Sequence, residues 1–121
     1  MPAPTINLIV LRVADIEAAN QFYSALGFSF TKHAHGKGPT HYAAEEGPVV
    51  FEIYPQATDG DSTKGVRLGF QVSNIGEMLA CAEKHGARIL SPAKESPWGL
   101  RAVIEDPFGH KIEFTAQENK R

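Results

Sequence analysis

Three histidines gather in the first half of this 121-residue chain, in a pattern that could do chemistry. His33, His35 and His41 surround Gly36-Lys37-Gly38 within nine positions. Imidazole is a common metal ligand, so the three side chains together could bind a metal ion. A segment with two glycines is flexible, however, and the alternative is three solvated surface histidines. The glycines do not form a phosphate-binding loop, because the spacing and the following helix of that motif are absent.

Trp98 and Arg101 form a second group of candidates, around Pro97-Trp98-Gly99. An aromatic side chain beside glycine at the mouth of a pocket can cover a ligand. Arg101, three residues further on, could bind an anionic substrate. The alternatives are that Trp98 packs on the outside of a sheet or in a dimer contact, and that Arg101 pairs at the surface with Glu105 or another acid. The sequence leaves these alternatives open.

Two predicted helices position these residues. The first follows Asp15 as its N-cap and ends at Gly27, and the second follows Asn74 and ends at Gly86. Glu77 lies three residues after Asn74, which makes a capping box possible. Apolar residues recur at helical spacing in both segments. They are Ile16, Ala19, Phe22, Tyr23 and Leu26 in the first helix, and Ile75, Met78, Leu79 and Ala82 in the second.

Strand-like runs surround both helices. They cover residues 6–13, 28–31, 41–44 and 48–54 in the first half, and residues 66–72, 87–90, 100–104 and 110–115 in the second. Residues 45–47 predict a hairpin turn. Asp106-Pro107-Phe108-Gly109 suits a type I turn, because proline stands at its second position and glycine at its fourth. Residues 56–64 are polar and rich in turn formers, which is typical of a linker.

The two halves repeat one another. A shift of 59 residues superimposes the strand end, the helix cap, the first apolar residue and the terminal glycine of each half: Val13 on Val72, Asp15 on Asn74, Ile16 on Ile75 and Gly27 on Gly86. The helix caps, the terminal glycines and the apolar residues at helical spacing all agree between the two halves. Each half is therefore predicted to fold as one strand, a helix and three further strands.

Composition limits the partners and the location. The formal net charge is −2 and the pI is about 6.2, which argues against a nucleic-acid partner. The basic tail Asn119-Lys120-Arg121 is too short to change this. The first residues lack the features of a signal peptide or membrane span. Cys81 is the single cysteine, so no intrachain disulfide can form and the cytosol is the simplest location. Its small neighbours predict a buried core thiol and not a nucleophile.

A family resemblance extends over about residues 6–115. Its carriers are Leu11-Arg12-Val13-Ala14-Asp15-Ile16, Phe22-Tyr23, Leu26-Gly27-Phe28, Trp98-Gly99-Leu100-Arg101 and Glu105-Asp106-Pro107-Phe108-Gly109-His110-Lys111-Ile112-Glu113-Phe114. On these residues the chain resembles the vicinal oxygen chelate superfamily, which includes glyoxalase I, bleomycin-resistance proteins, fosfomycin-resistance enzymes and extradiol dioxygenases. The resemblance implies one α+β domain over residues 1–121. Two βαβββ modules, at about 5–55 and 65–117, would curve their mixed sheets into a cup around a ligand. It also implies a homodimer.

The resemblance also indicates site positions. In metal-dependent members, each module gives one ligand from its first strand and one from its last, commonly His or Glu. The last-strand positions here are Glu52 and Glu113, as in glyoxalase I, and the first-strand positions are Leu8 and Arg67. Leucine has no donor atom and arginine carries only N–H groups, so half of the expected chelate is missing. No cofactor is therefore favoured, although a divalent metal held by Glu52 and Glu113 is possible.

Arg67 suggests what could replace the metal. Two carboxylates that face each other repel without a counter-charge, and the planar guanidinium group suits carboxylates. We expect Arg67 to occupy the space of the metal and to pair with Glu52, Glu113 or both. The alternative is that Arg67 lies on a sheet edge and that both glutamates are solvated.

The favoured function is a metal-independent small-molecule-binding protein of the glyoxalase/bleomycin-resistance type. His41 and Tyr42 open a strand, so one of them could line the cup and offer a hydrogen bond or a proton-transfer group. Aromatic walls from Tyr42, Tyr54 and Trp98, with a few acids, would suit a cationic, planar or sugar-like compound. The net charge of −2 gives only mild attraction to a cation.

Two catalytic alternatives use the same residues. A divalent-metal-dependent lyase resembling lactoylglutathione lyase, or a dioxygenase, would need Glu52 and Glu113 at the metal. A metal-free enzyme could hold an oxyanion with Arg67 while Glu52 or Glu113 acts as the base. The sequence does not separate binding from catalysis.

Overall fold

Each half of the chain folds as one strand, a helix and three further strands, as the repeat predicts. The computed structural model describes residues 1–117, so the basic tail Asn119-Lys120-Arg121 lies outside the described residues. The chain divides into two units after Thr63, within the predicted linker. That the two units form one domain stays a prediction.

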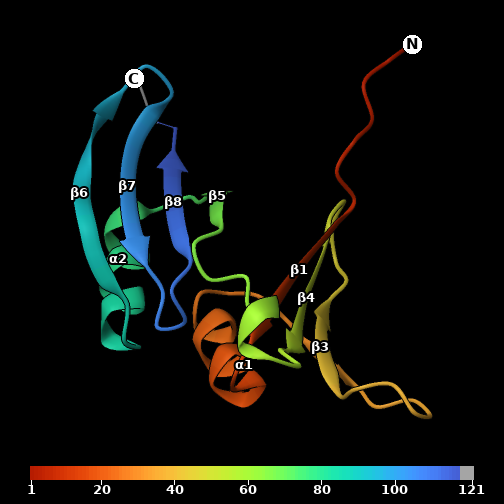
Figure 1. Ribbon diagram of the computed structural model, residues 1–121. Coiled ribbons are helices and arrows are strands. Elements are labelled where there is room, and N and C mark those ends of the chain that lie inside the picture. Colours follow the sequence, from red (N-terminus) through yellow and green to blue (C-terminus); the bar gives the residue numbers. More distant parts are fainter. Residues whose placement is uncertain (118–121) are drawn as a thin grey trace. The chain divides into compact units, whose positions relative to one another are not determined.

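The first unit contains a four-stranded mixed sheet with the strand order β1-β4-β3-β2 (Figure 1). β1 and β4 are parallel, and the other neighbours are antiparallel. Its elements are β1 (Leu8–Val13), α1 (Ile16–Ala25), β2 (Thr31–His33), β3 (His41–Ala44) and β4 (Val50–Pro55), followed by the 3₁₀ helix η1 (Asp59–Asp61).

The second unit repeats this topology with the order β5-β8-β7-β6 (Figure 1). β5 and β8 are parallel, and β6, β7 and β8 are antiparallel in turn. Its elements are β5 (Arg67–Gln71), α2 (Ile75–Lys84), β6 (Arg88–Ser96), β7 (Gly99–Glu105) and β8 (Lys111–Ala116). The α+β class and the two βαβββ modules are thus confirmed.

Each sheet has an apolar face, which its own helix covers, and a second face that this helix does not cover, here called the open face. α1 packs on β3 and β4, and α2 packs on β6, β7 and β8. Because side chains alternate along a strand, apolar residues at every second position reach the helix. The largest fully buried side chains are Tyr23, Phe114, Leu11, Ile53, Ile104, Ile112 and His110. The open faces carry polar side chains of the strands, Glu52 and Glu113 among them.

Both helices begin and end as predicted. The side chains of Asp15 and Asn74 accept hydrogen bonds from the third helical N–H, at 3.1 and 3.0 Å. Gly27 and Gly86 have positive φ, and the following amides close Schellman motifs onto Tyr23 and Ala82. Neither ten-residue helix is long and apolar enough to cross a membrane, and no other helix within residues 1–117 is.

The predicted strand at residues 28–31 is wrong. The structure places β2 at Thr31–His33 instead. The amide of Phe28 donates to the Tyr23 carbonyl at 3.2 Å to cap α1, so it is not free to pair with a strand. The rings of Phe28 and Phe30 pack on Phe51, with centroids 5.0 and 5.9 Å away. The alternating apolar pattern of this segment, which is typical of a strand, therefore comes from residues that pack beside the end of a helix.

Two further expectations need correction. The strand predicted at residues 87–90 continues through Pro92 to Ser96. β6 is an edge strand whose register shifts between Ile89 and Ser91 and again between Ser91 and Lys94, the interval that contains Pro92, so the missing N–H breaks no regular ladder. Cys81, predicted to be buried, is only half-buried, and its Sγ lies 3.9 Å from Nδ1 of His85.

The turn between β7 and β8 is organised by one buried carboxylate. Oδ1 of Asp106 accepts from the amides of Phe108 and His110 at 2.9 and 2.8 Å, and Oδ2 accepts from His110 Nδ1 at 2.8 Å. The side chains of Asp106 and His110 are fully buried. The predicted turn is confirmed by the Gly109 amide, which donates to the Asp106 carbonyl at 3.3 Å. This turn fixes the register in which β8 presents Glu113.

We expect Asp106→Ala to lower the free energy of unfolding by about 2–4 kcal/mol, because it leaves buried donors without their acceptor. Urea denaturation followed by circular dichroism measures the change. Asp59→Ala, at an exposed position in η1, is the matched control and should cost less than about 0.5 kcal/mol. Equal losses in the two variants would contradict a structural role for the Asp106 turn.

Candidate functional site

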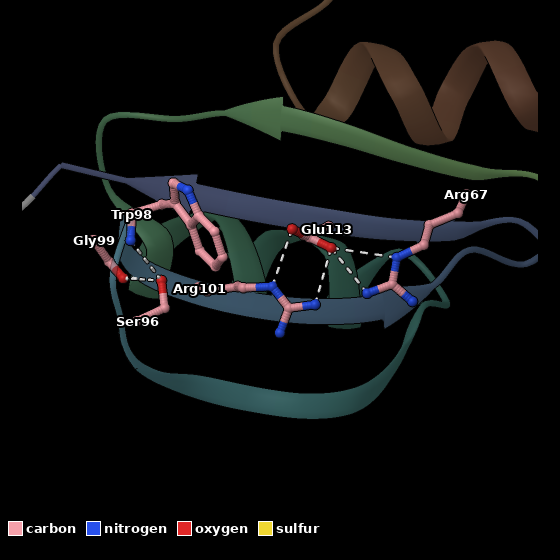
Figure 2. A network of polar contacts seen from close by, with 6 residues as sticks. All are labelled: Arg67, Ser96, Trp98, Gly99, Arg101 and Glu113. Atoms are coloured by element: carbon pink, nitrogen blue, oxygen red, sulfur yellow. Dashed lines mark hydrogen bonds and ion pairs between the residues drawn. The ribbon is translucent and has the colours of Figure 1, made fainter.

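Glu113 lies between two arginines on the open face of the second sheet (Figure 2). Arg67 on β5 donates to Oε1 of Glu113 from Nη2 at 2.8 Å and from Nε at 3.3 Å. Arg101 on β7 donates from Nη2 to Oε1 at 3.0 Å and contacts Oε2 through Nε at 3.0 Å. One carboxylate thus joins three neighbouring strands.

The arginines set the ionisation of this carboxyl group. Hydrogen bonds from Arg101, and then from Arg67, lower the pKa of Glu113 from 4.5 to about 2, against a smaller opposing effect of burial. The same contact raises the pKa of Arg101. A carboxylate with such a low pKa is a weak base near neutral pH. Its lone pairs are also committed to guanidinium donors, which makes it a poor metal ligand.

The predicted ion pair of Arg67 with Glu113 is confirmed. The side chain of Arg67 is still 48 % exposed, compared with 28 % for Glu113, so the pair is half-buried and not sealed in the core. Arg67 and Glu113 come from parallel neighbouring strands, where Glu113 stands beside Gly69. That Arg67 takes the space of a metal stays a prediction.

The residues at the expected chelate positions do not fit a divalent ion. Leu8 is 51 % exposed and offers no donor atom, Arg67 is a cation, and Glu113 is bound to two guanidinium groups. Within the part of the chain that the structure describes, no group of three or more His, Cys, Asp or Glu side chains is arranged to hold a metal.

Trp98 and Arg101 lie on or beside the same sheet face as Glu113 (Figure 2). Trp98 is at the turn between β6 and β7 and is 70 % exposed. Its amide donates to Ser96 Oγ at 3.2 Å, and that hydroxyl donates to the Gly99 carbonyl at 2.7 Å. Arg101 pairs with Glu113 and not with Glu105, which instead binds Arg88 at 2.6 Å. Ligand contacts for Trp98 and Arg101 stay predictions.

Glu52 occupies the corresponding position in the first unit. It lies on β4 between Val10 of β1 and Ala43 of β3, just as Glu113 lies between Gly69 and Val103. Its side chain makes no hydrogen bond or ion pair with any other residue in 1–117. The two glutamates that the resemblance singles out therefore have different surroundings within their own units.

His41 and Tyr42 point to opposite faces of the first sheet. Tyr42 is on the face that α1 covers, is 7 % exposed and donates its hydroxyl to Glu17 at 2.6 Å. This contact lowers the pKa of Glu17 and raises the pKa of Tyr42. His41 shares the open face with Tyr54, and their rings stack at 4.2 Å. The position of His41 fits the expected ligand role better than that of Tyr42.

The three histidines between residues 33 and 41, out of five in the chain, are brought together. His33 Nδ1 lies 3.3 Å from His35 Nε2, and the rings of His33 and His41 stack at 5.4 Å. Arg12 extends the stack from the other side, with its guanidinium carbon 5.2 Å from the Tyr54 ring centroid. Sequence reasoning missed Arg12. The signal was its position in an otherwise apolar first strand, where it faces Tyr54 of the parallel neighbour.

The chain matches one protein-family model over most of its length. The model of the Glyoxalase/Bleomycin resistance protein/Dioxygenase superfamily matches residues 5–114. A comparison with curated proteins finds no significant match.

Solved structures share this fold over nearly the whole chain. TnmS3, an antibiotic binding protein from Streptomyces sp. CB03234, superimposes with a TM-score of 0.78 at 20 % identity, covering 98 % of this chain and 99 % of its own. The hypothetical protein SA1046 from S. aureus gives 0.74 at 18 % identity, covering 93 % and 96 %. A glyoxalase/bleomycin resistance protein/dioxygenase family enzyme from Burkholderia phytofirmans PsJN gives a TM-score of 0.73 at 18 % identity, covering 93 % of this chain and 98 % of its own. At these identities the likeness shows the fold alone.

Replacing Glu113 should change the pH dependence of stability. Because the folded-state pKa of Glu113 is below 4.5, its ionised form stabilises the fold above that pH, and this contribution is lost as the pH falls towards 2. Glu113→Gln should therefore be less stable than the wild type by about 1–2 kcal/mol at pH 7, with a smaller difference below about pH 4.

Thermal denaturation between about pH 3 and pH 7 measures this difference. Glu52→Gln is the matched control, because it makes the same change at a carboxylate without an ion pair in its unit. A constant difference between the wild type and Glu113→Gln over the whole range would contradict the two-arginine account.

Proposed function

Since this chain belongs to the glyoxalase/bleomycin resistance protein/dioxygenase superfamily, we propose that it binds a small organic molecule without a divalent metal ion. The observation that carries the proposal is the contact of Glu113 with both Arg67 and Arg101. This residue stands where metal-dependent relatives supply a ligand. Here it is bound by two cations and lies beside an exposed aromatic side chain.

Electrostatics support the metal-independent part. A divalent ion near Glu113 would have to displace or approach two guanidinium groups, each a full positive charge within 3.0 Å of the carboxylate. Like charges at such distances repel strongly. Leu8, at the other first-strand position, has no donor atom that could bind the ion. A lyase or dioxygenase mechanism that depends on the chelate therefore has no support from these donors.

The fold of the relatives supports the binding part. TnmS3, which is described as an antibiotic binding protein, matches this chain over nearly the full length of both. A ligand on the open face of the second sheet would find an aromatic ring at Trp98 and charged hydrogen-bond donors at Arg67 and Arg101. This combination suits a compound with a flat ring and polar oxygen atoms.

A metal-free enzyme is the second candidate, and Glu52 is the observation that favours it. Its carboxylate is the one of the two expected glutamates without an ion pair in its own unit, so it is the better candidate for a catalytic base. Glu113 serves this role less well because its pKa is about 2.

We also propose that the protein forms a homodimer and that it resides in a reducing compartment. β1 and β5 are edge strands, and the apolar residues Leu8 and Val66 at their starts are 51 % and 39 % exposed. Edge strands that begin with exposed apolar side chains favour association. The single cysteine requires no oxidising environment.

Metal addition tests the proposal directly. Ni²⁺, Zn²⁺, Mn²⁺ and Fe²⁺ added to chelator-treated, untagged protein should leave the melting temperature within about 1 °C, whereas an ion at about 100 times its Kd would raise it by roughly 10 °C. A stoichiometric ion that stabilises the wild type, but neither Glu52→Gln nor Glu113→Gln, would contradict metal independence.

A ligand screen tests the binding part in the same assay. A panel of flat aromatic compounds, both neutral and charged, should contain members that raise the melting temperature in a saturable way. The control is a variant with Trp98→Ala and Arg101→Ala, for which the same compounds should give smaller shifts. Shifts that are equal in the wild type and in this variant would exclude the open face of the second sheet as the binding site.

A further inference from the structure

The open face of the second sheet carries an excess of positive charge, although the whole chain has a net charge of −2. The register of the strands places the side chains that share this face. Five of them are basic and two are acidic, an excess of three: Arg67, Arg88, Lys94, Arg101 and Lys111 against Glu105 and Glu113. The positive electrostatic potential of such a face attracts anions and repels cations.

The acids of this face are already neutralised. Glu105 binds Arg88 at 2.6 Å, and Glu113 is shared by Arg67 and Arg101. One carboxylate balances only one of its two guanidinium groups. Of the excess of three charges, one is therefore left on the two arginines beside Glu113, whose side chains are 48 % and 30 % exposed, and the other two are on Lys94 and Lys111.

Both guanidinium groups keep donors for a ligand. Each contacts Glu113 through Nε and Nη2, and an arginine has five N–H donors in all. The Nη1 groups make no hydrogen bond with other residues in 1–117, and the third nitrogen of each group points away from the carboxylate (Figure 2). Glu113 holds the two forks in place, which reduces the entropy that a bound anion would cost.

Trp98 adds an aromatic surface next to these donors. Its indole extends over the same face as Arg101 and Glu113 (Figure 2). Ser96 Oγ closes the turn that carries it by accepting from the Trp98 amide and donating to the Gly99 carbonyl. Gly99 adopts a φ of 109°, and a side chain at this position would meet the Ala116 carbonyl. An exposed tryptophan held next to cationic donors can stack on a flat ring whose acidic group reaches the arginines.

We propose that the open face of the second sheet binds a planar aromatic or conjugated compound that carries an acidic oxygen group, such as a carboxylate, with Arg67 and Arg101 on the anion and Trp98 on the ring. This inference rests on the proposed function and makes it more specific. Of the cationic, planar or sugar-like compounds expected from the sequence, it keeps the planar kind and gives it a negative charge.

Three related probes separate charge from shape. Anthraquinone-2-carboxylate is planar and anionic, anthraquinone-2-carboxamide has the same shape without the charge, and 2-(aminomethyl)anthraquinone is cationic. Trp98 is the single tryptophan of the chain, so quenching of its fluorescence reports binding at this face. N-acetyltryptophanamide corrects for absorption by the probes, and titration calorimetry gives an independent Kd.

The carboxylate should bind at least about tenfold more tightly than the amide, and the cation more weakly than either. Arg101→Gln should remove most of the preference for the carboxylate, and Arg101→Lys should keep only part of it, because a point charge replaces a planar fork. Lys84→Gln, at the exposed end of α2, is the matched control. It removes the same charge from outside this face and should leave the preference unchanged. Melting curves confirm that each variant is folded.

Each other outcome has a definite meaning. Equal affinity for the three probes, or tightest binding of the cation, would overturn the anionic inference and leave the proposed binding function standing. If Lys84→Gln and Arg101→Gln weakened the binding of the carboxylate equally, the anionic inference would also be overturned. The overall charge of the protein would then be sufficient to explain the binding. If no probe binds while compounds of the screen still stabilise the protein, the ligand class is wrong and the binding function is not.

Discussion

The shared carboxylate of Glu113 is the interaction on which the character of the second unit depends. A lone carboxylate on this face would attract metal ions and protons. Two guanidinium groups within 3.0 Å keep it ionised and lower its pKa to about 2. The contact also ties β5, β8 and β7 together on the side that α2 does not cover. The buried Asp106 turn supports it, because that turn sets the register in which β8 presents Glu113 to Arg101.

The two units apply one topology to different chemistry. Both place a glutamate at the same point of their last strand, next to the parallel first strand. In the second unit, basic residues from both neighbouring strands reach that glutamate. In the first unit, the neighbours of Glu52 are Val10 and Ala43, and the polar side chains instead stack as Arg12, Tyr54, His41 and His33. The two units thus share one topology while the side chains on their open faces differ.

Local signals made much of the fold predictable from the sequence. Asp15, Asn74, Gly27 and Gly86 define helix ends through contacts within a few residues, so their roles could be read directly. The strand at residues 28–31 was misread because the Phe28 amide caps α1, a contact that depends on the helix end and the core together. The resemblance and the need for a counter-charge indicated that Arg67 pairs with Glu52, Glu113 or both, and the structure shows the pair with Glu113. The participation of Arg101 depends on the β7–β8 register, which pairwise spacing in the sequence does not reveal.

If Arg67 and Arg101 keep Glu113 ionised down to low pH, the titration of its own carboxyl group reports this most directly. The ¹³C chemical shift of the Glu113 side-chain carboxyl, assigned by its loss in Glu113→Gln, can be followed as the pH is lowered from 7. With a pKa of about 2, the resonance should still be that of the carboxylate at about pH 3.5. A midpoint near the ordinary value of 4.5 would show that the arginines do not hold this group, and it would contradict the account.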